Sequence, residues 1–123
     1  MSIRINALIL WSERPERVAA FYRLLGLPLA DEDHGDGHVH QACDCGGLHV
    51  AVYGGGAGGR PPARRAAGSA MVGFVVPSLA AVTEALRAAG ELRELVAPQQ
   101  MDWGLRAVFE DPDGRAVELT EGA

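Results

Sequence analysis

Basic charge is scarce in this chain and comes from arginine alone, because not one of its 123 residues is a lysine. The 11 arginines are outnumbered by 16 acidic residues, which gives a formal net charge of -5. A protein with this charge repels a phosphate backbone, so we expect no nucleic-acid partner. The missing lysine also excludes a phosphate-binding P-loop. The use of arginine in place of lysine, with abundant alanine and glycine, favours a bacterial source.

Cysteines and long apolar runs are also few. Cys43 and Cys45 are separated by one residue, which is neither a CxxC motif nor a disulfide framework, so two free thiols without a chemical role are expected. No apolar run approaches the roughly 18 residues of a membrane helix, and the first residues lack the apolar core of a signal peptide. We therefore expect a cytoplasmic protein with no membrane partner.

The first half of the chain predicts a strand, a helix and three further strands. Residues 3–11 form an apolar run of strand length, and Pro15 opens a stretch with apolar residues at helical spacing that ends before Gly26. Three short strands separated by turn residues follow. Their expected ranges are 27–33, 38–43 and 48–53, with a hairpin turn over 44–47 between the last two.

The second half repeats this order after a linker rich in glycine and proline at 54–69. A strand over 71–76 precedes a helix with Ser78 as its N-cap, which Gly90 ends. The remaining strands are expected at 92–97, 103–110 and 115–120, with the turn Asp111–Gly114 between the last two.

The repeat predicts an α+β fold made of two tandem β-α-β-β-β modules. The helix starts are offset by about 64 residues and the hairpin turns by about 67, as in a duplicated module. We expect residues 1–123 to form a single domain, with module one at 1–53, the linker at 54–69 and module two at 70–123.

Two motifs connect this pattern to a known family. Phe21-Tyr22-x-x-Leu25-Gly26 ends the first helix, and Trp103-Gly104 leads to Asp111-Pro112-Asp113-Gly114-x-x-Val117-Glu118-Leu119. With the double module, they resemble the vicinal oxygen chelate superfamily of glyoxalases, bleomycin resistance proteins and dioxygenases, and most of all its metal-free drug-binding branch. The resemblance implies a cupped mixed sheet, helices on its convex side, and a homodimer with two equivalent sites.

Strand alternation places the side chains of each module on two faces. Valines and leucines suit the face covered by a helix, whereas the opposite face would line the cup, where aromatic rings stack on a flat ligand. The residues expected on the cup face are Ile5, Ala7, Ile9, Trp11, His38, His40, His49, Ala51, Tyr53, Met71, Gly73, Val75, Trp103, Leu105, Ala107, Phe109, Ala116, Glu118 and Thr120. The ligand-binding residues expected among them are Trp11, His38, His40, His49, Tyr53, Met71, Trp103, Leu105, Phe109 and Glu118. Arg60, Arg64 and Arg65 of the linker would form a movable rim.

The enzymes of the family hold a metal through side chains on the first and last strands of each module. The corresponding positions here are Ala7, Met71, Glu118 and, depending on the hairpin register, Ala51 or His49. Because alanine has no ligand atom and a thioether suits hard divalent ions poorly, we expect no metal and no cofactor. A rival site of three imidazoles, from His38, His40 and His49, remains an alternative. The acidic run at 31–36 is interpreted as a solvated edge.

These features favour a protein that binds and does not catalyse. The resemblance implies sequestration of a small, flat aromatic antibiotic or metabolite, with bleomycin-like, mitomycin-like and anthraquinone-fused enediyne drugs as candidates, and thus resistance by drug binding. One alternative is a metal-independent enzyme with Glu118 as general base, and a third is a divalent-metal enzyme of the glyoxalase or dioxygenase type. No catalytic residue is assigned, since the chain has no Gly-x-Ser-x-Gly elbow.

Overall fold

The computed structural model describes residues 5–33, 39–54 and 70–122. The chain divides into two compact units, the first made of Met1–Arg23 with Leu27–Pro62 and the second of Leu24–Gly26 with Ala63–Ala123. His38 and the predicted rim arginines at 60, 64 and 65 lie outside the described residues. None of the described helices is long and apolar enough to cross a membrane.

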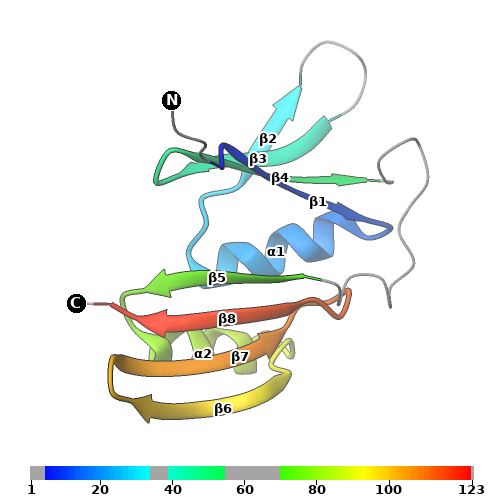
Figure 1. Ribbon diagram of the computed structural model, residues 1–123. Coiled ribbons are helices and arrows are strands. Elements are labelled where there is room, and N and C mark those ends of the chain that lie inside the picture. Colours follow the sequence, from blue (N-terminus) through cyan, green and yellow to red (C-terminus); the bar gives the residue numbers. More distant parts are fainter. Residues whose placement is uncertain (1–4, 34–38, 55–69, 123) are drawn as a thin grey trace, which may run out of the picture. The chain divides into compact units, whose positions relative to one another are not determined.

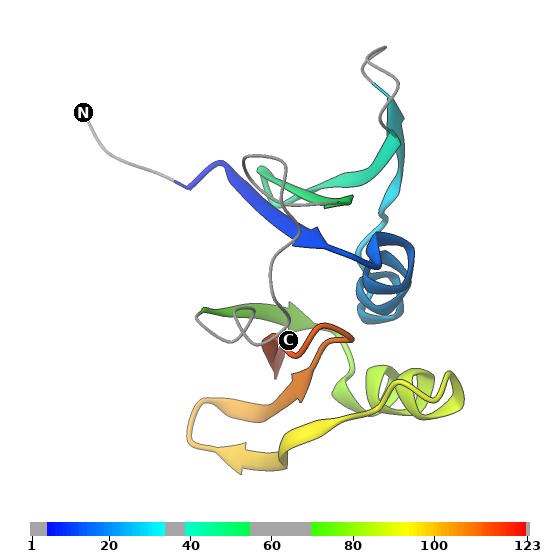
Figure 2. The same ribbon diagram turned by 90° about the vertical axis from the view of Figure 1, so that its right-hand side faces the viewer.

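The first unit is a four-stranded mixed sheet with one helix along one face (Figures 1 and 2). The strands are ordered β1-β4-β3-β2, with β1 parallel to β4 and the other neighbours antiparallel. The element bounds are β1 Ala7–Ser12, α1 Pro15–Leu25, β2 Ala30–Asp33, β3 Val39–Cys45 and β4 Leu48–Gly54.

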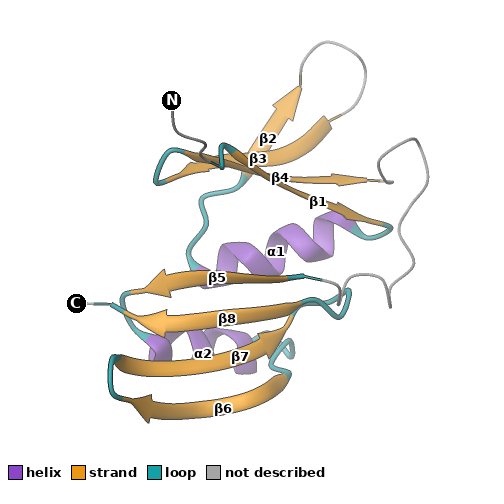
Figure 3. Cartoon of the chain, viewed as in Figure 1, coloured by secondary structure: helices purple, strands orange, loops and turns teal. Residues whose placement is uncertain are grey.

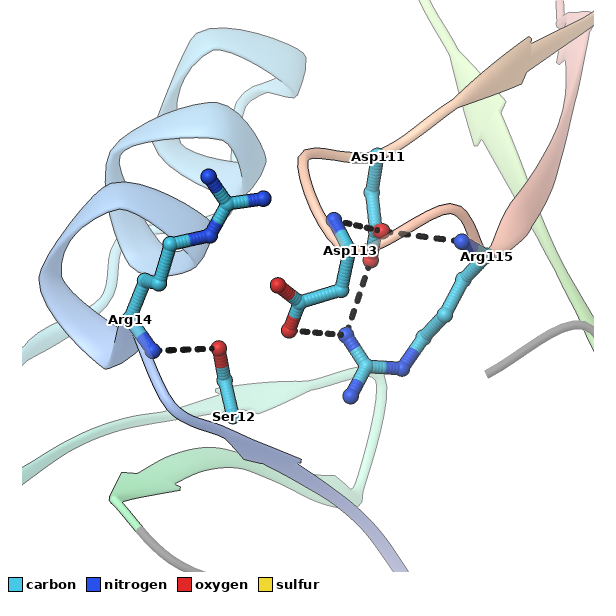
Figure 4. Close-up of polar contacts among 5 residues, drawn as sticks. All are labelled: Ser12, Arg14, Asp111, Asp113 and Arg115. Carbon is cyan, nitrogen blue, oxygen red and sulfur yellow. Dashed lines mark hydrogen bonds and ion pairs between the residues drawn. The ribbon is translucent and has the colours of Figure 1, made fainter. Parts of the chain in front are cut away.

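Local signals account for the bounds of α1. Pro15 takes the first helical position, where the missing N–H costs nothing. Just before it, the Ser12 hydroxyl accepts a hydrogen bond of 2.9 Å from the Arg14 backbone N–H (Figure 4). The helix ends at Gly26, whose φ of 115° lies outside the range that other residues adopt easily.

The second unit repeats this architecture, so the predicted α+β fold of two tandem β-α-β-β-β modules is confirmed (Figure 3). Its strands are ordered β5-β8-β7-β6, with β5 parallel to β8, and α2 packs against β7 and β8. The element bounds are β5 Met71–Val76, α2 Leu79–Ala88, β6 Glu94–Met101, β7 Gly104–Glu110 and β8 Ala116–Glu121.

Two side chains satisfy the N-terminus of α2. The hydroxyl of the predicted N-cap, Ser78, accepts a hydrogen bond of 3.1 Å from the Ala81 N–H. The Glu121 carboxylate, from the end of β8, accepts one of 2.8 Å from the Leu79 N–H. A carboxylate at this end also favours the helix dipole, so β8 and α2 stabilise each other.

We expect Ser78→Ala to lower the free energy of unfolding by about 1 kcal/mol, because the Ala81 N–H loses its acceptor. Ser78→Asp restores an acceptor and is expected to behave like the native chain. Urea denaturation of the three proteins measures the difference. Equal midpoints for Ser78→Ala and the native chain would show that the cap contributes nothing.

The connection between β7 and β8 is held by a buried ionic cluster (Figure 4). Asp111 Oδ1 accepts hydrogen bonds from the backbone N–H groups of Asp113 and Arg115, at 2.8 and 3.0 Å. The Arg115 guanidinium donates to Asp111 Oδ2 at 3.0 Å and to Asp113 Oδ2 at 3.4 Å. The turn therefore includes Arg115, and β8 begins one residue later than expected, at Ala116.

Further boundaries also differ from the sequence expectations. β2 begins at Ala30 and not at residue 27, and β6 spans Glu94–Met101 and not 92–97. β1 begins at Ala7 and not at residue 3. The first hairpin turn is only Gly46-Gly47, with φ of 59° and 88°, so Cys45 is not in the turn but pairs with Leu48 at the end of β3. Two glycines at positive φ match a two-residue turn whose twist suits a hairpin.

Candidate functional site

One face of the first sheet gathers several of the residues predicted for the cup. The β1–β4 register pairs Ala7 with His49, Ile9 with Ala51, and Trp11 with Tyr53. Directly paired residues share a face, and the β3–β4 register adds His40 to the same side. The other face carries Leu10, Val50 and Val52, which are buried. Trp11, His40, His49, Ala51 and Tyr53 are thus together on one face.

A row of four side chains crosses this face, one from each strand of the sheet. The rings of Trp11 and Tyr53 are 5.1 Å apart and tilted by 41°. Tyr53 is also stacked on His40, with ring centroids 4.0 Å apart and 13° between the planes. His40 Nε2 lies 2.9 Å from Glu32 Oε1 on β2. We call Trp11, Tyr53, His40 and Glu32 the aromatic row.

Burial within the aromatic row is greatest at His40, and the other three members are partly exposed. The His40 side chain is 2% exposed and is held on one side by Tyr53 and on the other by Glu32. Because a buried imidazole with a carboxylate partner has a fixed ring orientation, it fixes the Tyr53 ring in turn. Trp11 and Tyr53 are only half-buried, so each residue keeps some surface open to solvent.

The second sheet carries a different arrangement on its face opposite α2. Glu118 pairs with Gly73 on β5 and with Val108 on β7. Arg106, two residues before Val108, lies on the same face and donates from Nε to Glu118 Oε2 at 2.8 Å. Of the predicted residues, Met71, Gly73, Val75, Ala116, Glu118 and Thr120 share this face.

The structure corrects the placement of three residues of β7. Leu105, Ala107 and Phe109 were expected beside Glu118, but the register pairs Ala107 with Leu119 and Phe109 with Val117, on the α2 side. The cause is the extra turn residue, Arg115, because a shift of one residue moves every side chain of a strand to the other face. Phe109 is fully buried in the core, so Leu105, Ala107 and Phe109 do not line the open face.

Trp103 lies in the two-residue turn between β6 and β7, next to the Met101–Gly104 pair. Its side chain is 59% exposed. Met71 and Val75 are also largely exposed, at 52% and 73%. A shallow pocket of about 220 Å³ lies at the end of β5, lined by Val75, Val76, Pro77 and Gly122. Exposed apolar surface therefore lies along β5, and also at Ile5, Leu95 and Trp103.

The residues at the family's metal positions do not fit a divalent ion. Ile9 pairs with Ala51 just as Gly73 pairs with Glu118, so the register identifies Ala51, and not His49, as the counterpart of Glu118. Two alanines, a thioether and one carboxylate bound to Arg106 make a poor donor set. Within the described ranges, no group of three or more His, Cys, Asp or Glu side chains could hold a metal. The three-imidazole alternative includes His38, outside those ranges.

Both cysteines are free thiols on the face of the first sheet opposite the aromatic row. Burial raises the pKa of the Cys43 thiol, and the neighbouring Cys45 and Asp44 raise it further. A raised pKa leaves the thiol protonated at neutral pH, which is the opposite of an activated nucleophile. The structure gives Cys43 no role as a nucleophile.

Sequence reasoning missed two polar residues of these faces. Glu32 was assigned to a solvated edge, and Arg106 was not singled out. Alternation of side chains along β2 would have placed Glu32 on the same face as Ala30. The contact of Glu32 with His40, however, can be inferred only from the β2–β3 register. Arg106 becomes a neighbour of Glu118 only once the five-residue turn is known.

Comparison with known proteins identifies the fold family. A model of the Glyoxalase/Bleomycin resistance protein/Dioxygenase superfamily matches residues 4–119. No curated protein sequence matches the chain. Among solved structures, the oxidase ChaP-H2 is 18% identical with a TM-score of 0.71, and the match covers 100% of this chain and 96% of that one.

An antibiotic binding protein and a bleomycin resistance determinant are similar to nearly the same degree. TnmS3, an antibiotic binding protein from Streptomyces sp. CB03234, is 21% identical with a TM-score of 0.69, over 100% of this chain and 99% of that one. A bleomycin resistance determinant encoded on the transposon Tn5 is 22% identical with a TM-score of 0.64, over 98% of each chain. Because both an oxidase and an antibiotic binding protein share the fold, the fold alone does not separate binding from catalysis.

Proposed function

Because the chain belongs to the Glyoxalase/Bleomycin resistance protein/Dioxygenase superfamily, we propose that it sequesters a small, flat aromatic antibiotic or metabolite without the help of a metal. The aromatic row carries this proposal, since half-buried Trp11 and Tyr53 rings backed by a fixed His40 form a surface on which a planar molecule stacks. The likeness to TnmS3, an antibiotic binding protein, and to the Tn5 bleomycin resistance determinant supports it, because both have the same fold.

Sequestration requires affinity and nothing else, because a bound drug is withheld from its target by mass action. A nanomolar dissociation constant corresponds to about -12.3 kcal/mol. Rings held in place before binding lose little conformational entropy when the ligand arrives, which favours such an affinity.

We further propose that the protein acts in the cytoplasm as a homodimer with two equivalent sites, since two-fold dimers are the commonest assemblies.

Catalysis by Glu118 is the weaker alternative. As a general base, Glu118 would take up a proton and lose its charge, and with it the ion pair to Arg106 at 2.8 Å. The aromatic row likewise contains no pair of residues arranged as nucleophile and base among those described. The geometry therefore supports a ligand that is bound and released unchanged.

The proposal predicts stoichiometric binding without turnover. Purified protein incubated with a panel of flat aromatic antibiotics is expected to hold one unchanged ligand per subunit in native mass spectrometry. The same spectrum reports the number of subunits and any bound metal. A change in the mass of the ligand would show that the protein is a catalyst and does not sequester the ligand. Failure of every flat aromatic compound to bind would refute the proposal. Released ligand, analysed after denaturation, serves as the control for covalent attachment.

A further inference from the structure

The two cysteines of the chain lie on the same face of one strand. Cys43 and Cys45 are two residues apart on β3, where they pair with Val50 and Leu48 of β4. Side chains two residues apart on a strand point in the same direction, so the two thiols are neighbours. Both are free and half-buried, and Cys45 is close enough to raise the pKa of the Cys43 thiol. The proposed function uses neither of them.

The spacing of the two thiols suits a bridging metal ion better than a disulfide. Alternate residues of a strand lie about 6.7 Å apart, and their Cα–Cβ bonds are nearly parallel. A disulfide needs Cβ atoms only about 3.5–4.5 Å apart, so a direct bond would require the backbone to move. Two thiolate–metal bonds of about 2.3 Å on opposite sides of one ion span about 4.6 Å, which the sulfur atoms reach by leaning about 1 Å each.

The number of available ligands decides which kind of ion fits. Asp44, between the two cysteines, pairs with His49 on the opposite face of the sheet and is no third ligand. In the part of the chain that the structure describes, no group of three or more His, Cys, Asp or Glu side chains could hold a metal. Zinc takes four ligands, whereas a soft ion that binds two thiolates in a line needs no others.

The surroundings of the two thiols also select the charge of the ion. Val50, directly across from Cys43, is 1% exposed, so the site is apolar on this side. Burial raises the pKa of Cys43 because it disfavours the negative thiolate. A divalent ion bound by two thiolates forms an uncharged complex, whereas a monovalent ion leaves one negative charge in the same place. The half-buried setting therefore favours a divalent soft ion.

We propose that Cys43 and Cys45 form a chelating site for a soft divalent cation of the mercuric class. Two S–H bonds break, two protons leave, and both thiolates bind the ion, so the step needs no oxidant or reductant. The site lies on the face of the first sheet opposite the aromatic row. It is therefore independent of the proposed binding of a flat ligand.

Mercury(II) supplied as its bis-glutathione complex tests the site by native mass spectrometry. At micromolar protein, the native chain is expected to take up one ion per subunit and to release both glutathione molecules. The second thiol of the chain acts at an effective concentration of about 1 mM, well above that of the released glutathione. The mass of the subunit then rises by one mercury less two hydrogens. Zinc at the same concentration is expected not to be retained.

Cys43→Ser and Cys45→Ser are each expected to carry mercury only together with one glutathione, because a single thiol leaves the second ligand in place. Asp44→Cys combined with Cys45→Ser is the matched control, since it keeps two cysteines but places them on opposite faces of the sheet. This double variant is expected to behave like the single ones. Thermal unfolding establishes that each variant is folded.

Three results would overturn the inference. Retention of glutathione by the native chain, or the absence of mercury from it, would show that the two thiols do not chelate. One ion shared by two chains would show that Cys43 and Cys45 are too far apart to bind it together. Release of both glutathione molecules by the matched control would show that a shared face is not required. Binding of flat aromatic ligands is measured separately, so the proposed function stands or falls on its own.

Discussion

Tyr53→Ala is expected to weaken binding of a flat aromatic ligand about hundredfold, the largest loss of any single substitution on the first sheet. Tyr53 is the central ring of the aromatic row and contacts Trp11 at 5.1 Å and His40 at 4.0 Å. Its removal deletes a stacking surface and also the support that orients the other two rings. Aromatic anchors at the centre of a site typically contribute 2 kcal/mol or more, about 30-fold, and the lost support adds to this.

Tyr53→Phe is the matched control, because it keeps the ring and removes only the hydroxyl. We expect its dissociation constant, measured by quenching of tryptophan fluorescence or by calorimetry, to remain within about threefold of the native value. Trp11→Ala should give an intermediate loss, since Trp11 is at the end of the row, whereas Tyr53 lies between two rings. If Tyr53→Ala bound as tightly as Tyr53→Phe while remaining folded, the aromatic row would not be the site.

Local chemistry explains why the fold was predictable. Ser78 caps α2, Gly26 ends α1 at positive φ, and Gly46-Gly47 forms the first hairpin turn, each from signals within a few residues of sequence. The face of the first sheet was predictable for the same reason. The observed hairpin turn between β3 and β4 is two residues shorter than the predicted one. Because the difference is an even number of residues, the same side chains share a face in both registers.

Which side chains of β7 lie on which face of the sheet was not predictable in this way, because it depends on whether Arg115 belongs to the turn. A four-residue turn at Asp111–Gly114 would pair Glu110 with residue 115, whereas the observed pair is Glu110 with Ala116. Arg115 joins the turn because its guanidinium and its N–H both bind Asp111, a tertiary preference that strand propensity does not reveal. This single difference moved Phe109 to the core and brought Arg106 beside Glu118.

The polar partners of the candidate site were beyond prediction for a related reason. Glu32 and His40 are eight residues apart and belong to different strands, and Arg106 and Glu118 are separated by twelve. Such pairs follow only from the strand register, which a single sequence determines weakly where turns are ambiguous. Residue types alone therefore identified the ring-lined face of the first sheet, but neither Glu32 as the partner of His40 nor, on the second sheet, Arg106 as the partner of Glu118.

The same ionic cluster that sets the register should also dominate the stability of the second unit. Asp111→Ala is expected to lower the free energy of unfolding by about 3 kcal/mol, because breaking a buried ion pair leaves the Arg115 charge poorly compensated. The Asp111 side chain is fully buried, and its loss also removes the acceptor of two backbone N–H groups. Differential scanning calorimetry is expected to show a fall in the melting temperature of about 10 °C.

Two variants separate the contributions within the cluster. Asp111→Asn keeps an oxygen for the backbone N–H groups of Asp113 and Arg115 but removes the charge, so its loss measures the ion pair to Arg115. Glu84→Ala is the matched surface control, because its ion pair with Arg87 lies on exposed side chains and is expected to contribute less than about 1 kcal/mol. If Asp111→Ala lowered the free energy of unfolding no more than Glu84→Ala does, strand pairing and not the ionic cluster would hold the turn. The register that places Arg106 beside Glu118 would then not depend on the Asp111–Arg115 contact.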